Sequence, residues 1–456
     1  MQAGEILRRA FTSFLAIPTG VIATFVLLAI GTYVFERSEI GWFGPIRSYM
    51  QAHVFGDAEA TSGLLGTIAT GIITMTSITF SLLLLALQQS AGSMTHQVFD
   101  QFLRRRLNQV YFGFFIGVTL YSLITLATVS PPFNPVFGAS LTLLFVTMAL
   151  YILLLLIYST ISQMRPTEII RSIHDHTLAA RQRQLPMIER TRRSPALPAA
   201  PAVSVPAPGE GFVVGYDLDA MAKAIGRAPE PVEIVLLLPI GSYVAFHDPV
   251  AEVRGGAGAE GVARTVANAI QIDQVRALDN DPAYGIEQIE TIAWRSISTS
   301  QQNPSPGLVA IRNLRDILAR WIAGKDDREE TATIAVVYPD NAMSRLLAAL
   351  ESLAVVASEA MQHQVYAEIV RTVTLTFERL PPEPRRRAEE LILRGLAGLG
   401  DHMLTMELDD ALITLARVLE QSRCVDTAAA VRAAHAGLAT SIGKLNSRST
   451  RVPGAG

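Results

Sequence analysis

Four long apolar runs constrain the fold of this chain more than any other feature of its sequence. Each run is about 20 residues or longer, enough to cross a hydrocarbon core roughly 30 Å thick. None of the runs contains a charged residue, half of all residues are hydrophobic, and only 17% are charged. That composition is too apolar for an ordinary soluble protein. We therefore expect residues 1–165 to form a bundle of four membrane-spanning helices near 14–35, 62–87, 109–129 and 138–158.

Charges between the runs predict how the chain is oriented. The loop between the first two runs holds two arginines and four acidic residues, a net charge of −2, and the turn 130–137 is uncharged. Arginines instead flank the other ends of the runs, including the cluster Arg104, Arg105 and Arg106. The positive-inside rule then predicts that both termini are cytoplasmic. The arginine cluster either sets this topology alone or also binds lipid headgroups.

The second run carries a regular band of hydroxyl side chains. In 67-TIATGIITMTSITFS-81 they recur at steps of three and four, so a helix places them on one face: Thr67, Thr70, Thr74, Ser77 and Ser81. The third run offers a weaker companion set, Thr119, Ser122 and Thr125. Two interpretations stay open. The band is either a helix–helix interface, which nearby glycines would favour, or the lining of a water-filled path between several copies.

The residues after the runs predict a cytoplasmic region of mixed α+β structure. Residues 166–209 read as a juxtamembrane helix followed by a Pro/Ala spacer, 194-SPALPAAPAVSVPAPG-209. Apolar alternation in 210–254 predicts a small β module, with Asp217 or Asp219 capping a short helix. Amphipathic periodicity predicts a mainly helical domain over 255–445, and 446–456 reads as a disordered tail.

Three motifs resemble chemical sites but lack the partners that such sites need. The triplet 174-HDH-176 places its histidines on different helix faces, with no third ligand near. The sequence 256-GAGAEG-261 matches G-x-G-x-x-G, but its flanking segments do not predict two parallel strands. One cysteine, Cys424, excludes an internal disulfide. We therefore expect no metal, no cofactor and no enzymatic activity, and the net charge of −3 gives no indication of nucleic-acid binding.

Two blocks resemble the bacterial family of predicted membrane proteins that carry domain of unknown function 2254. They are 82-LLLLALQQSAGSMTHQVFDQFLRRRLNQVYFGFFIG-117 and 276-RALDNDPAYGIEQIETIAWRSIS-298. The resemblance implies an inner-membrane location and no established activity. This chain departs from the family pattern at 298-STSQQNPSPG-307, where Asn303 or Ser305 would replace an aspartate as a helix cap. In 279-DNDP-282, Asp279 and Asp281 either bind a cation or form a turn before a helix, and the turn is favoured.

Two functions remain compatible with these features. The first is a passive homo-oligomeric channel lined by the hydroxyl band. The second is a membrane-anchored protein that binds a cytoplasmic partner and transports nothing. Coupled transport is disfavoured because the predicted spans hold no ionisable side chain.

Overall fold

The computed structural model describes residues 15–37, 48–93, 106–163, 165–276, 278–298, 303–324, 332–399 and 403–441. The chain divides into two compact units, Met1–Arg165 and Pro166–Gly456. The predicted tail 446–456 lies outside the described residues, as do Arg104 and Arg105.

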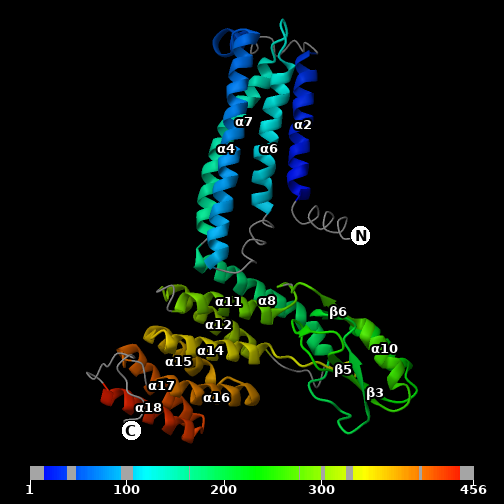
Figure 1. Ribbon diagram of the computed structural model, residues 1–456, viewed down its shortest axis with the longest axis vertical. Coiled ribbons are helices and arrows are strands. Elements are labelled where there is room, and N and C mark those ends of the chain that lie inside the picture. The colour runs from blue at the N-terminus through cyan, green and yellow to red at the C-terminus, as the bar shows by residue number, and fades with distance from the viewer. Residues whose placement is uncertain are drawn as a thin grey trace. The chain divides into compact units, whose positions relative to one another are not determined.

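The first unit is a bundle of four long helices (Figure 1). They are α2 (Ala16–Arg37), α4 (Ala58–Ser93), α6 (Arg106–Thr128) and α7 (Val136–Gln163), with a short π-helical turn, η3 (Gln51–Phe55), before α4. Each of the four helices is long and apolar enough to cross a membrane. The four predicted spans are therefore present as helices.

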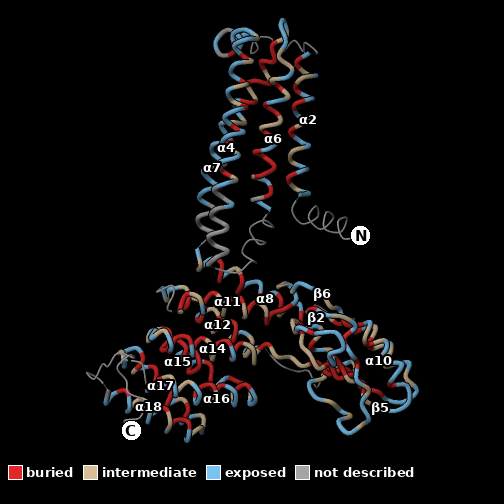
Figure 2. The backbone as a smooth tube through the Cα atoms, in the orientation of Figure 1, coloured by how far each residue is buried: buried red, intermediate tan, exposed pale blue. Residues whose placement is uncertain are grey.

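Helix α6 forms the core of this bundle and packs against α2, α4 and α7. Its most extensive contact is with α2, where 113-GFFIG-117 contributes two glycines. A Cβ atom on Gly113 would lie 2.9 Å from Pro18 Cα, and one on Gly117 would lie 2.4 Å from the ring of Phe25. Small residues four positions apart let two helices approach this closely. Figure 2 shows the resulting burial along α6, in contrast to the exposed outer faces of α4 and α7.

The second unit contains a β module made of two small sheets. One sheet has the order β1-β5-β3-β7, and the other has the order β4-β2-β6. The strands are β1 (Ala202–Pro206), β2 (Gly211–Tyr216), β3 (Val232–Leu236), β4 (Tyr243–Val244), β5 (Pro249–Gly255), β6 (Ile270–Asp273) and β7 (Val336–Val337). Helices α9 (Leu218–Arg227) and α10 (Ala259–Ala269) complete the module. Its apolar core includes Val213, Met221, Ile234, Val253 and Val266.

The predicted spacer is wrong, because residues 194–209 are built into this module. Strand β1 pairs antiparallel with β5, with Val203 opposite Val253. The carboxylate of Glu233, which is only 1% exposed, accepts hydrogen bonds from the backbone N–H groups of Ala196 and Leu197 at 3.0 and 3.1 Å. The β module therefore extends beyond the predicted 210–254, and the boundary between the two units falls at residue 165.

The remaining elements are helices, as the amphipathic patterns predict. They are α8 (Pro166–Arg190), α11 (Pro282–Ile297), α12 (Ser305–Ala323), α14 (Ala342–Glu359), α15 (His363–Phe377), α16 (Pro382–Leu399), α17 (Met406–Gln421) and α18 (Val425–Ser441). Helix α11 packs against α8, α12 and α14.

Candidate functional site

The hydroxyl band of the second span lies on the outer surface of α4. Its five residues are all exposed, and the buried face of α4 is instead formed by apolar residues such as Leu65, Ala69 and Ile72. Thr67, Thr70 and Thr74 each donate to the carbonyl oxygen four residues earlier at 2.9 Å. Such bonds make a hydroxyl inexpensive within a span. The band therefore takes no part in the packing of its own bundle.

The companion set of the third span does not share this surface. Ser122 and Thr125 are buried inside the bundle, with exposed fractions of 0% and 5%, and Thr119 is half-buried. The hydroxyl oxygen of Ser122 is buried and has no hydrogen-bond partner. The two sets that the sequence places together thus lie on an outer face and in an inner core, respectively.

The glycines near the band are also open rather than packed. A Cβ atom added at Gly63, Gly66 or Gly71 would meet nothing within 4 Å. Close helix packing in this bundle occurs at Gly113 and Gly117 instead, which the sequence analysis missed. The spacing G-x-x-x-G in 113-GFFIG-117 was the signal that could have identified them.

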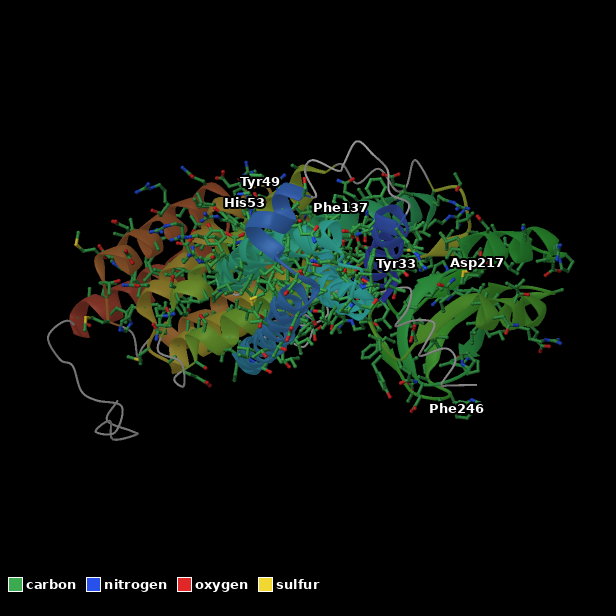
Figure 3. All side chains as sticks on the ribbon, turned by 90° about the horizontal axis from the view of Figure 1, so that it is seen from above. Tyr33, Tyr49, His53, Phe137, Asp217 and Phe246 are labelled. Atoms are coloured by element: carbon green, nitrogen blue, oxygen red, sulfur yellow. The ribbon has the colours of Figure 1, made fainter. Side chains whose placement is uncertain are left out.

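Glu36 is a buried carboxylate, and it is one of the four acidic residues predicted to lie in the loop between the first two runs. It belongs to α2 and is 7% exposed. Its oxygens accept the backbone N–H groups of Phe137 at 2.7 Å and Gly138 at 3.3 Å, which open α7. A carboxylate at this position also interacts favourably with the helix dipole. The rings of Tyr33 and Phe133 make an edge-to-face contact at the same end of the bundle. Figure 3 labels Tyr33 and Phe137.

Glu36 also places an ionisable side chain within the first candidate span, because α2 extends through Glu36 and Arg37. The expectation that the spans hold no ionisable side chain, on which coupled transport was disfavoured, is therefore wrong. Buried polar groups surround the same end of the bundle: the hydroxyl of Tyr121 lies 3.3 Å from that of Thr32. The bundle therefore has a polar core near the start of α7.

Of the arginine cluster, only Arg106 lies within the described residues. It is the first residue of α6 and is exposed. Its position at a helix end is compatible both with a topology signal and with a contact to lipid headgroups.

The block 276–298 contains the whole of α11 and the ion pairs at the start of this helix. Asp281 is the N-cap of α11 and accepts the backbone N–H of Tyr284 at 3.0 Å, which confirms the predicted turn and cap. Arg276 donates to Asp281 at 2.9 Å and to Glu287 at 2.7 Å. Burial lowers the pKa of a guanidinium, but these two carboxylates outweigh it and raise the pKa of Arg276. The block therefore fixes a helix start.

The loop 256–261 is occupied by a carboxylate of the protein itself. Glu230 accepts the backbone N–H of Ala257 at 2.6 Å. Gly258 adopts a φ of +100°, which suits glycine, and opens α10. The strands on either side, β5 and β6, belong to different sheets. The loop therefore lacks the two parallel strands of one sheet that a dinucleotide site needs, and Glu230 lies where a phosphate would bind.

His174 is part of a charged cluster between α8 and α12. Its Nδ1 lies 2.9 Å from Asp175 and its Nε2 lies 2.8 Å from Asp316. Partial burial raises the pKa of Asp316, but hydrogen bonds from Arg320 and His174 outweigh this and hold the pKa below its ordinary value. Within the described residues, no group of three or more His, Cys, Asp or Glu side chains is arranged to hold a metal ion.

Comparison with known proteins assigns the chain to a family. The family described as predicted membrane protein (DUF2254) matches residues 11–373, and the chain belongs to it. Uncharacterized proteins of Mycobacterium bovis and Mycobacterium tuberculosis are 26% identical to it over 297 residues, or 61% of this chain and 55% of each relative. The chain thus spans about half the length of these curated relatives. No solved structure matches it.

Proposed function

We propose that several copies of this chain associate in the bacterial inner membrane through the hydroxyl face of α4 and enclose a passive path for small solutes or ions. The observation that carries the proposal is the exposure of Thr67, Thr70, Thr74, Ser77 and Ser81 on the outside of the bundle. Hydroxyl groups that face acyl chains make no favourable polar contact with the lipid. The same groups stabilise close helix packing or replace water around a permeating ion.

The outer surface of α7 supports the proposal by contrast. It is covered by large apolar side chains of the kind that lipid solvates well: Leu143, Leu144, Met148, Leu150, Tyr151, Leu154, Leu155 and Ile157. Helix α4 interrupts its apolar surface with exposed glycines and hydroxyls. In the proposed assembly α7 faces lipid and α4 faces other copies, with both termini of the chain in the cytoplasm.

Two measurements test this proposal. The mass of the detergent-solubilised protein should correspond to several copies, and a monomer would contradict the proposal. Reconstituted protein should conduct, and Thr74→Leu together with Ser77→Leu should reduce the conductance. Thr147→Leu is the matched control, because Thr147 is an exposed hydroxyl of α7 that bonds its own helix in the same way. An oligomer whose conductance is equal in both variants would exclude the lining role.

A membrane-anchored binding protein is the second candidate function. Helices of the second unit expose large apolar side chains, including Val355, Leu375, Met406 and Ile413, which suit contact with a protein partner. Pull-down from native membranes should then recover a protein with the full chain and lose it with Leu375→Glu. Recovery of nothing specific would count against this candidate.

A further inference from the structure

A groove of about 500 Å³ lies in the second unit between α8 and the β module. Helix α8 forms one wall with Arg183, Met187 and Arg190, and β2 with the start of α9 forms the other. Asp217, labelled in Figure 3, marks the start of α9 at this groove. Volumes of this size accommodate small organic ligands.

The groove is lined by both apolar and polar side chains. Leu218 and Ile240 are buried core residues, and Met187 packs partly buried against the same core. The exposed carboxamides of Gln271 and Asn280 lie on the rim. The buried carboxamide of Gln184 also lines the groove and donates to the hydroxyl of Tyr338 at 3.1 Å. Apolar side chains combined with a few polar groups are usual in a small-molecule site.

The charged groups of the rim differ in how firmly they are paired. Arg190 donates to Asp219 at 2.6 Å, and this hydrogen bond and charge hold the pKa of Asp219 below its ordinary value. Asp217 accepts the backbone N–H of Ala220 as the cap of α9. Arg183 has a longer contact, a 3.4 Å approach to Asp279, and the two side chains are 50% and 65% exposed. Exposed pairs of this kind contribute little and exchange readily.

This arrangement defines the chemistry of a ligand. The weakly paired guanidinium of Arg183 suits an anionic group, and the apolar side chains of the lining suit a hydrocarbon body. Asp217 and Asp219 lie in the same groove and would repel a ligand of high negative charge, such as a nucleoside triphosphate. We infer that the groove binds a small organic monoanion, with its carboxylate on Arg183 and its apolar body against Met187, Leu218 and Ile240. This inference goes beyond the proposed function and is independent of whether α4 lines a path.

The test uses the full chain in lipid nanodiscs, with empty nanodiscs as the blank. The probe is 2-naphthoate, its neutral isostere is 2-naphthamide, and inorganic phosphate serves as an anion without an apolar body. Calorimetric titration should show saturable binding of 2-naphthoate that is at least about tenfold tighter than binding of the amide, because a charge-assisted hydrogen bond is lost in the amide.

Variants then locate the binding. Arg183→Met should weaken 2-naphthoate binding about tenfold or more and leave binding of the amide unchanged. Arg227→Met is the control, because Arg227 is an exposed arginine of α9 that does not line the groove. Both positions are surface-exposed, and equal melting temperatures would establish that the variants fold. Absence of 2-naphthoate binding, equal binding of the amide, equal binding of phosphate, or unchanged affinity in Arg183→Met would each overturn the inference.

Discussion

Replacement of Arg181 by methionine is expected to destabilise the second unit by about 3 kcal/mol. Arg181 on α8 makes two parallel hydrogen bonds to Asp340, at 2.9 and 2.6 Å. The two side chains are only 17% and 12% exposed. Removal of the guanidinium leaves a carboxylate with little access to water, which costs roughly 3–5 kcal/mol for a fully buried pair. Because some water reaches this pair, we take the lower end of that range.

The assay is urea unfolding of the full chain in detergent at neutral pH, followed by tryptophan fluorescence. Trp321 is a suitable reporter, because the Arg181 guanidinium lies 5.5 Å from its ring. Arg183→Met is the matched control, two residues along the same helix. The carboxylate partner of Arg183 is exposed and 3.4 Å away. The free energy of unfolding of this control should therefore fall by less than about 1 kcal/mol. Equal losses in the two variants, or a loss below about 1 kcal/mol for Arg181→Met, would refute the reasoning.

Three further predictions concern other parts of the chain. Glu36→Gln should destabilise the first unit by about 1–2 kcal/mol, measured as a lower melting temperature in detergent, because the charged cap of α7 is lost. Gly285→Ala should destabilise the packing of α8 on α11 by roughly 1–3 kcal/mol, since a Cβ atom at position 285 would lie 1.9 Å from Thr177 Oγ1. Adding Thr177→Ala to this variant should restore part of the lost free energy of unfolding, measured by urea unfolding. The pKa of Asp316 is held below its ordinary value of 3.8, so the carboxylate stabilises the fold above that pH and the contribution is lost as the pH falls below it. Asp316→Asn should therefore be less stable than the parent protein at pH 7 and equally stable at low pH, and a constant difference across the titration would contradict this assignment.

Local patterns in the sequence predicted the helices well, because helix formation depends on periodicity and end signals that lie close together. Asp217 caps α9 as one of the two predicted residues, and Asp281 caps α11. At α12 the prediction is wrong: Asn303 accepts the backbone N–H of Ser305, but the N-cap is Pro304 and has no side-chain cap hydrogen bond. At α9 and α11 the capping side chain and the N–H group it binds are within a few residues of one another.

The errors involve partners that are distant in the sequence. Residues 194–209 looked like a spacer because their proline content is high, whereas strand pairing with β5 and the buried Glu233 decide their structure. Glu36 looked like a loop residue because its two N–H partners come about 100 positions later. The region 255–445 was predicted to be mainly helical, but strand β6 follows α10 directly after Ala269, since β6 pairs with β2.

Of the candidate site, the sequence predicted the grouping of the hydroxyl band but not its surroundings, because only the grouping depends on local periodicity. Helical periodicity placed the hydroxyl band of α4 on one face, and the structure has it on one exposed face. Periodicity cannot determine which face of a span turns inward. The set at Ser122 and Thr125 was therefore grouped with the band although it is buried in the bundle.

Cysteine accessibility in the membrane tests the central claim most directly. In a Cys424→Ser background, Thr74→Cys and Ser77→Cys on α4 are compared with Leu150→Cys, which is exposed on α7. We expect the two α4 positions to cross-link between copies or to react with a water-soluble thiol reagent, and the α7 position to do neither. If the α4 positions are as inert as Leu150→Cys in intact membranes, acyl chains cover the hydroxyl face and the proposed assembly is wrong.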